Sequence, residues 1–124
     1  MTSILAARDE LDAALVAGSI PVADAPGQAA PPCAIIFGEG LADLEHVVRG
    51  QVTARFRITL VAGGWDLAEV GRVLTGLVQQ TVTIIRATAG WRLDSVGRDG
   101  RVIGIAGGDM LGTEVIASRM IDIS

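Results

Sequence analysis

The segment Gln51–Val61 alternates apolar and polar side chains so regularly that it predicts a β-strand with two different faces. The apolar face consists of Val52, Ala54, Phe56, Ile58 and Leu60. The polar face consists of Gln51, Thr53, Arg55, Arg57 and Thr59. Such a strand needs a core on its apolar side. The polar side, with its arginines and threonines, must then face water, a substrate, nucleic acid or another protein.

The chain has 124 residues, of which 50% are hydrophobic, and this predicts one domain, residues 1–124, with a core of its own. The formal net charge is −4, from 14 acidic and 10 basic residues, and the basic residues are scattered. This argues against a nucleic-acid-binding protein, because phosphate contacts require a basic surface. No apolar run reaches the roughly 18 residues of a membrane span, and no signal peptide is recognisable. The lone Cys33 forms no internal disulfide, so we expect a protein made in a reducing cytoplasm.

Two segments have the periodicity of amphipathic helices. The first begins after Ser3 and ends at Gly18, with an apolar side formed by Ile4, Ala7, Leu11, Ala14 and Leu15. The second begins at Asp66, which can form a capping box with Glu69, and ends at Gly90. Its last part, "TVTIIRAT", is rich in β-branched residues, which leaves a strand open there. Trp65 and Trp91, at its two ends, are expected to anchor it on a sheet.

The remaining segments predict strands. Cys33–Phe37 lacks alternation and is expected to be buried on both faces, while the segment "EGLADLEHVVRG" is a long loop or a hairpin arm. "WRLDSVG" and "RVIGIAG", joined by a turn at residues 98–100, predict a hairpin, followed by a loop "GDMLG" and a last strand "TEVIASRMIDI". The fold class is therefore α+β: a mixed or antiparallel sheet of about four to five strands, with the N-terminal helix and the long helix packed on one face.

Residues that could carry chemistry form no recognisable pattern. His46, the only histidine, has no serine or cysteine nucleophile near it in sequence, and Cys33 opens a strand that predicts a packed thiol. The glycine runs lack the lysine of a phosphate-binding loop, since the chain contains no lysine. Asp94, Asp99 and Asp109 stand where turn residues are expected. We therefore predict no enzymatic activity, no cofactor and no metal site.

The order of these elements resembles a known family. A helix, "IPV", a proline-rich loop ending "APPCAIIFGEG", the strand of "RGQVTARFRITLVAGGWD", the helix "LAEVGRVLTGLVQQ", "GWRLDSVG" and a final strand "LGTEVIASRMIDI" are similar to the tail terminator proteins of long-tailed bacteriophages. The resemblance covers nearly the whole chain, and it includes no catalytic residue.

This resemblance implies a ring-forming structural protein and no enzyme. Tail terminators are small α/β proteins that assemble as a homo-oligomeric ring, commonly a hexamer, on the head-proximal end of the tail tube. The ring stops tube growth and presents a docking surface for the neck or head completion protein, and double-stranded DNA passes through its bore without sequence-specific binding. The implied location is the head–tail junction of the virion, after assembly in the host cytoplasm.

A ring requires head-to-tail contacts between different surfaces of the subunit. We expect Arg55 and Arg57 to form one flank, with acidic counterparts on the other at Glu39, Asp43, Glu45 and Glu114. The alternative is that both arginines simply lie on the sheet surface in water. The segment from Glu39 to Arg49 and the glycine-rich segment 107–112, which contains Asp109, are expected to contact tube or neck.

Two other interpretations stay open. A neck or head–tail completion protein of the same connector would share nearly all these features and would differ only in what it binds. A small cytoplasmic enzyme or ligand-binding domain would instead require a pocket that holds His46 near carboxylates.

Overall fold

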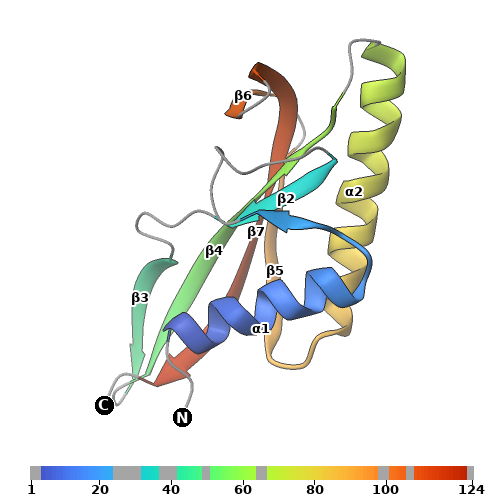
Figure 1. The fold of residues 1–124 in the computed structure, drawn as a ribbon. Helices are drawn as coiled ribbons and strands as arrows, with labels where there is room; N and C mark the ends of the chain where they lie inside the picture. Colours follow the sequence, from blue (N-terminus) through green and yellow to red (C-terminus); the bar gives the residue numbers. More distant parts are fainter. Residues whose placement is uncertain are drawn as a thin grey trace.

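The computed structural model describes residues 4–23, 32–36, 42–48, 51–63, 67–97, 101–105 and 108–122. Within these residues the chain forms two helices and seven strands (Figure 1). They are α1 (Ile4–Ala17), β1 (Val22–Ala23), β2 (Cys33–Ile36), β3 (Ala42–Val48), β4 (Gln51–Val61), α2 (Leu67–Ala87), β5 (Trp91–Val96), β6 (Arg101–Ile105) and β7 (Gly108–Asp122). The α+β class predicted from the sequence is confirmed.

Two long antiparallel strands, β4 and β7, form the centre of the sheet, paired from Gln51 opposite Asp122 to Val61 opposite Gly112. The other edge of β4 pairs with β2 and with β3, and the other edge of β7 pairs with β5 and with β6. β1 runs parallel to β2, so the sheet is mixed, and its continuous path is β1-β2-β4-β7-β5. β3 and β6 lie towards opposite ends of the sheet (Figure 1).

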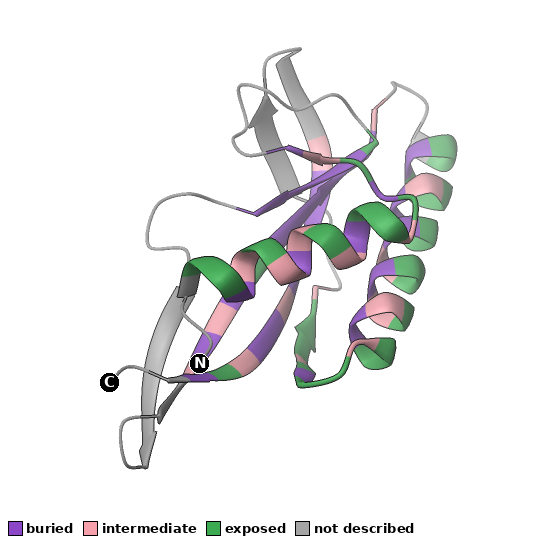
Figure 2. Cartoon of the chain, turned by 60° about the horizontal axis from the view of Figure 1, so that its bottom comes forward, coloured by how far each residue is buried: buried purple, intermediate pink, exposed green. Residues whose placement is uncertain are grey.

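Both helices pack on the apolar face of β4, as the sequence predicted. Ala54, Phe56, Ile58 and Leu60 are fully buried and share one core cluster with residues of both helices. The helical members of this cluster are Ala7, Leu11 and Leu15 of α1, and Leu77 and Ile85 of α2. The buried residues of each helix therefore form a stripe that faces the sheet (Figure 2).

Helix α1 ends in a Schellman motif whose left-handed residue is Ser19, with φ 69°. The Ile20 amide donates to the Leu15 carbonyl at 2.9 Å, and the Ser19 amide donates to the Val16 carbonyl at 3.0 Å. Gly18, the residue predicted to end the helix, serves another purpose: a Cβ there would collide with the Ile84 side chain of α2. The glycine thus permits close packing of the two helices, while a serine adopts the positive φ.

Replacing Ser19 by glycine is expected to raise the free energy of unfolding by up to about 1 kcal/mol, because glycine adopts positive φ without the Cβ penalty. Gly18→Ala is expected to have the opposite effect, because its Cβ would displace Ile84. Urea unfolding followed by circular dichroism measures both changes. A Ser19→Gly protein less stable than the wild type would contradict this account of the helix end.

Helix α2 continues through the β-branched segment to Ala87, so the strand left open by the sequence does not form. Thr81 and Ile85 are buried and continue the inward-facing stripe, which means that tertiary burial overrides the local β propensity. Gly90, with φ 86°, follows the helix and allows the chain to turn into β5. The expected capping box at Asp66 lies outside the described residues.

Gly71 and Gly76 lie inside α2, and a Cβ at either position would meet no atom within 4 Å. Replacing each by alanine is therefore expected to raise the free energy of unfolding by about 1 kcal/mol, through the higher helix propensity of alanine. The measurement is the urea unfolding midpoint of each variant. A loss of stability in either variant would mean that its Cβ does not point into open space.

The predicted hairpin between "WRLDSVG" and "RVIGIAG" is wrong. β5 and β6 do not pair with each other; both pair with β7, from Trp91 opposite Arg119 to Ile105 opposite Gly108. The hairpin that forms is that of β6 and β7, and the expected loop "GDMLG" is strand. Fifteen-residue β7 is long enough to pair with both shorter strands in succession. The predicted turn at residues 98–100 lies outside the described residues.

Of the two possibilities for the segment after β2, the hairpin arm is confirmed. β3 pairs antiparallel with β4 from Ala42 opposite Phe56 to Val48 opposite Gln51, with an irregularity between His46 and Val48. The segment is therefore a strand of the sheet, and the alternative of a long loop is wrong.

Candidate functional site

The sheet face opposite the helices, which we call the far face, carries the polar residues of β4 singled out by the sequence. The register places Arg55 opposite Ser118 and Arg57 opposite Ile116, so alternate residues of β7 share this face. One part of the far face is buried and includes Cys33, Ile35, Thr59 and Val61. Another part is accessible, because Arg57 is exposed and Met120 is 49% exposed. The far face is thus a partly open surface.

Two arginines of the far face converge on one carboxylate of β5. Arg55 Nε lies 3.4 Å from Asp94 Oδ2, and Arg92 Nε lies 2.9 Å from Asp94 Oδ1. The Asp94 side chain is 17% exposed, whereas that of Arg92 is 67% exposed. The sequence placed Asp94 in a turn, but it lies in β5 at an irregularity between Leu93 and Ser95. At least one arginine of the proposed flank therefore has its partner within the same chain.

The register gives the β4 partners of three of the acids expected on a separate flank. Asp43 is opposite Arg55, and Glu45 is opposite Thr53. Glu114 is opposite Thr59, on the far face of β7. The assignment of these acids and of the arginines to two flanks that meet in a ring stays a prediction. Asp109 lies in β7 opposite Gly104, and Glu39 and Arg49 fall outside the described residues.

A hollow of about 170 Å³ opens at one end of the sheet. Its lining can donate hydrogen bonds from hydroxyl and guanidinium groups, which suits water or a small anion. Among these lining residues no imidazole or carboxylate is present to activate a hydroxyl. The lining residues are Thr53, Gly90, Arg92, Ser118, Arg119 and Met120.

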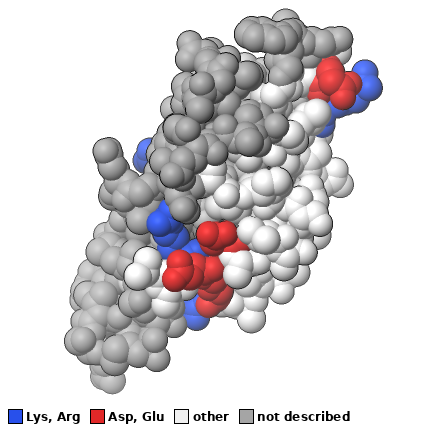
Figure 3. Space-filling view, in the orientation of Figure 1, with Lys and Arg blue, Asp and Glu red and all other residues white. Residues whose placement is uncertain are grey.

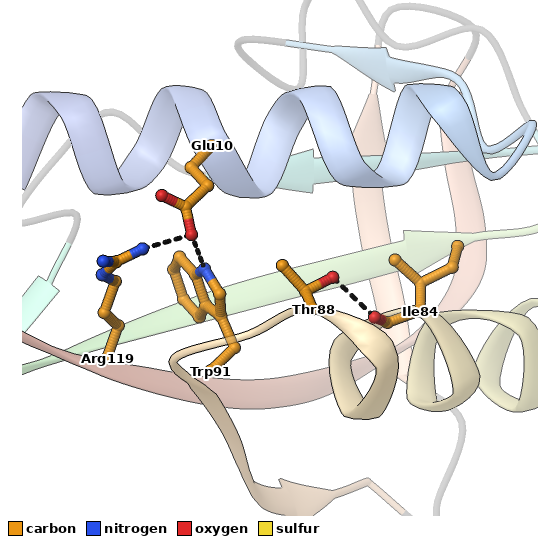
Figure 4. Close-up of polar contacts among 5 residues, drawn as sticks. All are labelled: Glu10, Ile84, Thr88, Trp91 and Arg119. Atoms are coloured by element: carbon orange, nitrogen blue, oxygen red, sulfur yellow. Dashed lines mark hydrogen bonds and ion pairs between the residues drawn. The ribbon is translucent and has the colours of Figure 1, made fainter.

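On the face of the sheet covered by the helices, Glu10 of α1 accepts hydrogen bonds from residues of β5 and β7. Trp91 Nε1 donates to Glu10 Oε1 at 2.7 Å, and the Arg119 guanidinium donates to the same oxygen (Figure 4). The Trp91 ring also packs on Phe56, with centroids 5.6 Å apart and planes tilted by 55°. Beside this cluster, the Thr88 hydroxyl donates to the Ile84 carbonyl at 2.7 Å in the last turn of α2. Trp91 was expected to anchor the long helix α2 on the sheet, but these side-chain contacts join α1 to the sheet instead. Trp65, the other expected anchor, lies outside the described residues.

Sequence reasoning missed Glu10 and Arg119 as members of this cluster. Glu10 follows Ala7, a residue of the apolar side of α1, by three positions, and its side chain is 38% exposed. Arg119 lies opposite Ala54, where it interrupts the apolar face of β7. The one available signal was this arginine at a core-facing position of the last strand. A charge at such a position predicts a nearby partner.

Two further residues weighed for chemistry, Cys33 and His46, lie on other strands than Asp94. Cys33 is buried in β2, which confirms the prediction of a packed thiol, and His46 lies in β3 opposite Val52. In the described part of the chain, no group of three or more histidine, cysteine, aspartate or glutamate residues could hold a metal ion. Neither helix there is long and apolar enough to cross a membrane.

No protein-family model matches the chain, and no curated protein matches it either.

Proposed function

We propose that the protein is a tail terminator, a structural virion protein that forms a ring on the head-proximal end of a phage tail tube. The observation that carries the proposal is the order of elements along the chain, from α1 to β7, because the resemblance to tail terminators rests on that order. The α+β subunit, with both helices on one face of a mixed sheet, agrees with this choice. The ring would stop tube growth and provide the docking surface for the neck.

The two hairpins supply segments for contacts with tube and neck. Asp43 and Glu45 lie in β3, in the hairpin at one end of the sheet, and Asp109 lies in the hairpin of β6 and β7 at the other (Figure 1). A ring subunit with arms at opposite ends can contact one neighbour below it and another above it. We propose that the β3–β4 hairpin and the β6–β7 hairpin make these contacts.

The net charge of −4 agrees with a bore through which DNA passes. A ring of six such subunits repeats this negative charge around its axis, and negative charge repels phosphates. DNA would thus slide through the ring without binding it. The protein would then act as a structural component that catalyses no reaction.

Electron microscopy of particles from cells that lack this gene tests the proposal, with the wild-type gene supplied on a plasmid as control. Tails of overlong and variable length, together with unattached filled heads, are expected. Tails of normal length left unjoined to heads would overturn the terminator role and favour the neck alternative. Particles of normal appearance would overturn any structural role at the head–tail junction.

A further inference from the structure

One side of α1 combines exposed apolar side chains with acids. Leu5, Asp9, Asp12 and Val16 recur every three or four residues and lie along one side of the helix, which we call the α1 stripe. Leu5 is 65% exposed and Val16 is 56% exposed, whereas Asp9 is exposed and Asp12 half-buried. The stripe thus has an acidic centre between two apolar ends, on the side of α1 turned away from the core.

The side of α2 turned away from the core carries charge only near its two ends: Arg72 beside Glu69, 3.6 Å apart, at one end and Arg86 at the other. Arg72, Gly76, Gln79, Thr83 and Arg86 are all exposed and follow the same helical spacing; we call them the α2 stripe. From Val73 to Ile85 the helix has no charged residue. The space-filling view shows acids gathered over α1 and a broad uncharged surface over α2 (Figure 3). The solvent side of a helix normally carries more charge than this.

Gly76 lies in the middle of the α2 stripe, and the fold does not require a glycine there. A Cβ at this position would meet no atom of the chain within 4 Å, yet glycine costs about 1 kcal/mol relative to alanine in a helix. An exposed glycine on a helix allows a second backbone to approach closely. The α2 stripe is therefore shaped for close contact with another helix.

We propose that the α1 stripe of one copy docks on the α2 stripe of a second copy of this chain. Charge complementarity identifies the occupant. The α1 stripe carries two acids, Asp9 and Asp12, whereas the ends of the α2 side carry two arginines against one acid, Glu69. The ion pair of Glu69 with Arg72 is exposed and contributes little, so Arg72 can exchange this partner for an acid of a second copy. By helical rise, Leu5 and Val16 are about 16 Å apart, and the two arginines are about 21 Å apart. The apolar ends of the α1 stripe can therefore lie along the aliphatic stems of Arg72 and Arg86, as arginine stems commonly permit.

The contact joins two different surfaces, so it is heterologous. Each copy that offers its α1 stripe keeps its α2 stripe for a further copy, and such contacts continue until a ring closes. The inference deepens the proposed function and rests on it only for closure into a ring. It uses neither Arg55 nor Arg57, which lie on the far face of the sheet.

Disulfide cross-linking between purified variants tests the contact directly. Asp9→Cys mixed with Gln79→Cys is expected to give linked heterodimers in several-fold higher yield than a control mixture of Asp9→Cys with Arg57→Cys. Arg57 is exposed but lies on the far face of the sheet, away from both stripes. Equal yields from the two mixtures would overturn the contact. Cross-linking traps weak complexes, so the result does not depend on a stable ring in solution.

A second measurement separates contact from stability. Both Gly76→Ala and Gly71→Ala add one methyl group into open space and are expected to stabilise the fold. Introduced into the Gln79→Cys chain, Gly76→Ala is expected to lower the cross-linking yield several-fold, whereas Gly71→Ala, which lies off the stripe, leaves it unchanged. An equal loss of cross-linking yield in both variants, or no loss in either, would contradict docking on the α2 stripe.

These outcomes are distinguishable from those of the gene deletion. Cross-links in the purified protein combined with normal particles would keep the contact and overturn the terminator role. Overlong tails without cross-links would keep the terminator role and overturn this contact.

Discussion

Replacing Trp91 by alanine is expected to lower the free energy of unfolding by about 3–5 kcal/mol, the usual cost of removing a large buried aromatic side chain. Trp91 is only 8% exposed, packs on the fully buried Phe56, and donates a hydrogen bond to Glu10. The substitution would leave a cavity between α1 and the sheet and remove one of the two donors to the Glu10 carboxylate. Urea unfolding followed by far-ultraviolet circular dichroism measures the loss.

Two further substitutions divide this effect between packing and polar contact. Trp91→Phe keeps most of the ring packing but removes the indole donor, so a loss of about 1–2 kcal/mol is expected. Glu10→Gln keeps an acceptor for Trp91 but removes the charge that faces Arg119, whose side chain is 20% exposed. Its expected cost is also about 1–2 kcal/mol, since the guanidinium loses a charged partner in a partly buried site. A Trp91→Ala protein no less stable than Trp91→Phe would contradict the packing role of the ring.

The helices and their faces could be predicted from the sequence because helical periodicity is a local signal. Leu11 and Leu15 of α1, and Leu77 and Ile85 of α2, are buried as their spacing indicates. The alternation in β4 likewise identified which residues face the core. In each of these segments, the pattern along the chain and burial in the fold agree.

The pairing of the C-terminal strands could not be predicted in the same way. The dipeptide Asp99-Gly100 is a strong local hairpin signal, but strand register depends on a partner distant in sequence. β7 offers one continuous edge from Gly108 to Arg119, and β5 and β6 use it in turn. The hairpin that forms is that of β6 and β7, which pair up to Ile105 opposite Gly108.

Of the residues in the two polar clusters, the sequence singled out Arg55, but it placed Asp94 in a turn and did not identify Glu10 or Arg119. The alternation of β4 placed Arg55 and Arg57 on one face, and the register confirms this face. The sequence could not show that β5 brings Asp94 within 3.4 Å of Arg55, because that contact depends on β7 lying between the two strands. The two helix stripes emerged only from the packed structure.

Replacing Gly97 by alanine is expected to lower the free energy of unfolding by about 1–3 kcal/mol, through overpacking against β7. A Cβ at Gly97 would lie 2.5 Å from Thr113 Oγ1 and 2.8 Å from the Glu114 carbonyl oxygen. The Gly97 amide also donates to that same carbonyl at 2.7 Å, so the backbone cannot move aside without losing a hydrogen bond. Because Gly97 has no side chain, the backbone can lie close against β7 at the end of β5, before the chain continues to β6.

The control is Gly76→Ala, the same chemical change at a glycine with open space around its missing Cβ. The two variants are expected to change stability in opposite directions, which separates the effect of close approach from the general effect of glycine on the unfolded chain. Thr113→Ala combined with Gly97→Ala should recover only part of the loss, because the Glu114 carbonyl remains in the way. If Gly97→Ala proved as stable as the wild type, the chain after β5 would not lie against β7. The continuous pairing of β5 and β6 along that strand would then be contradicted.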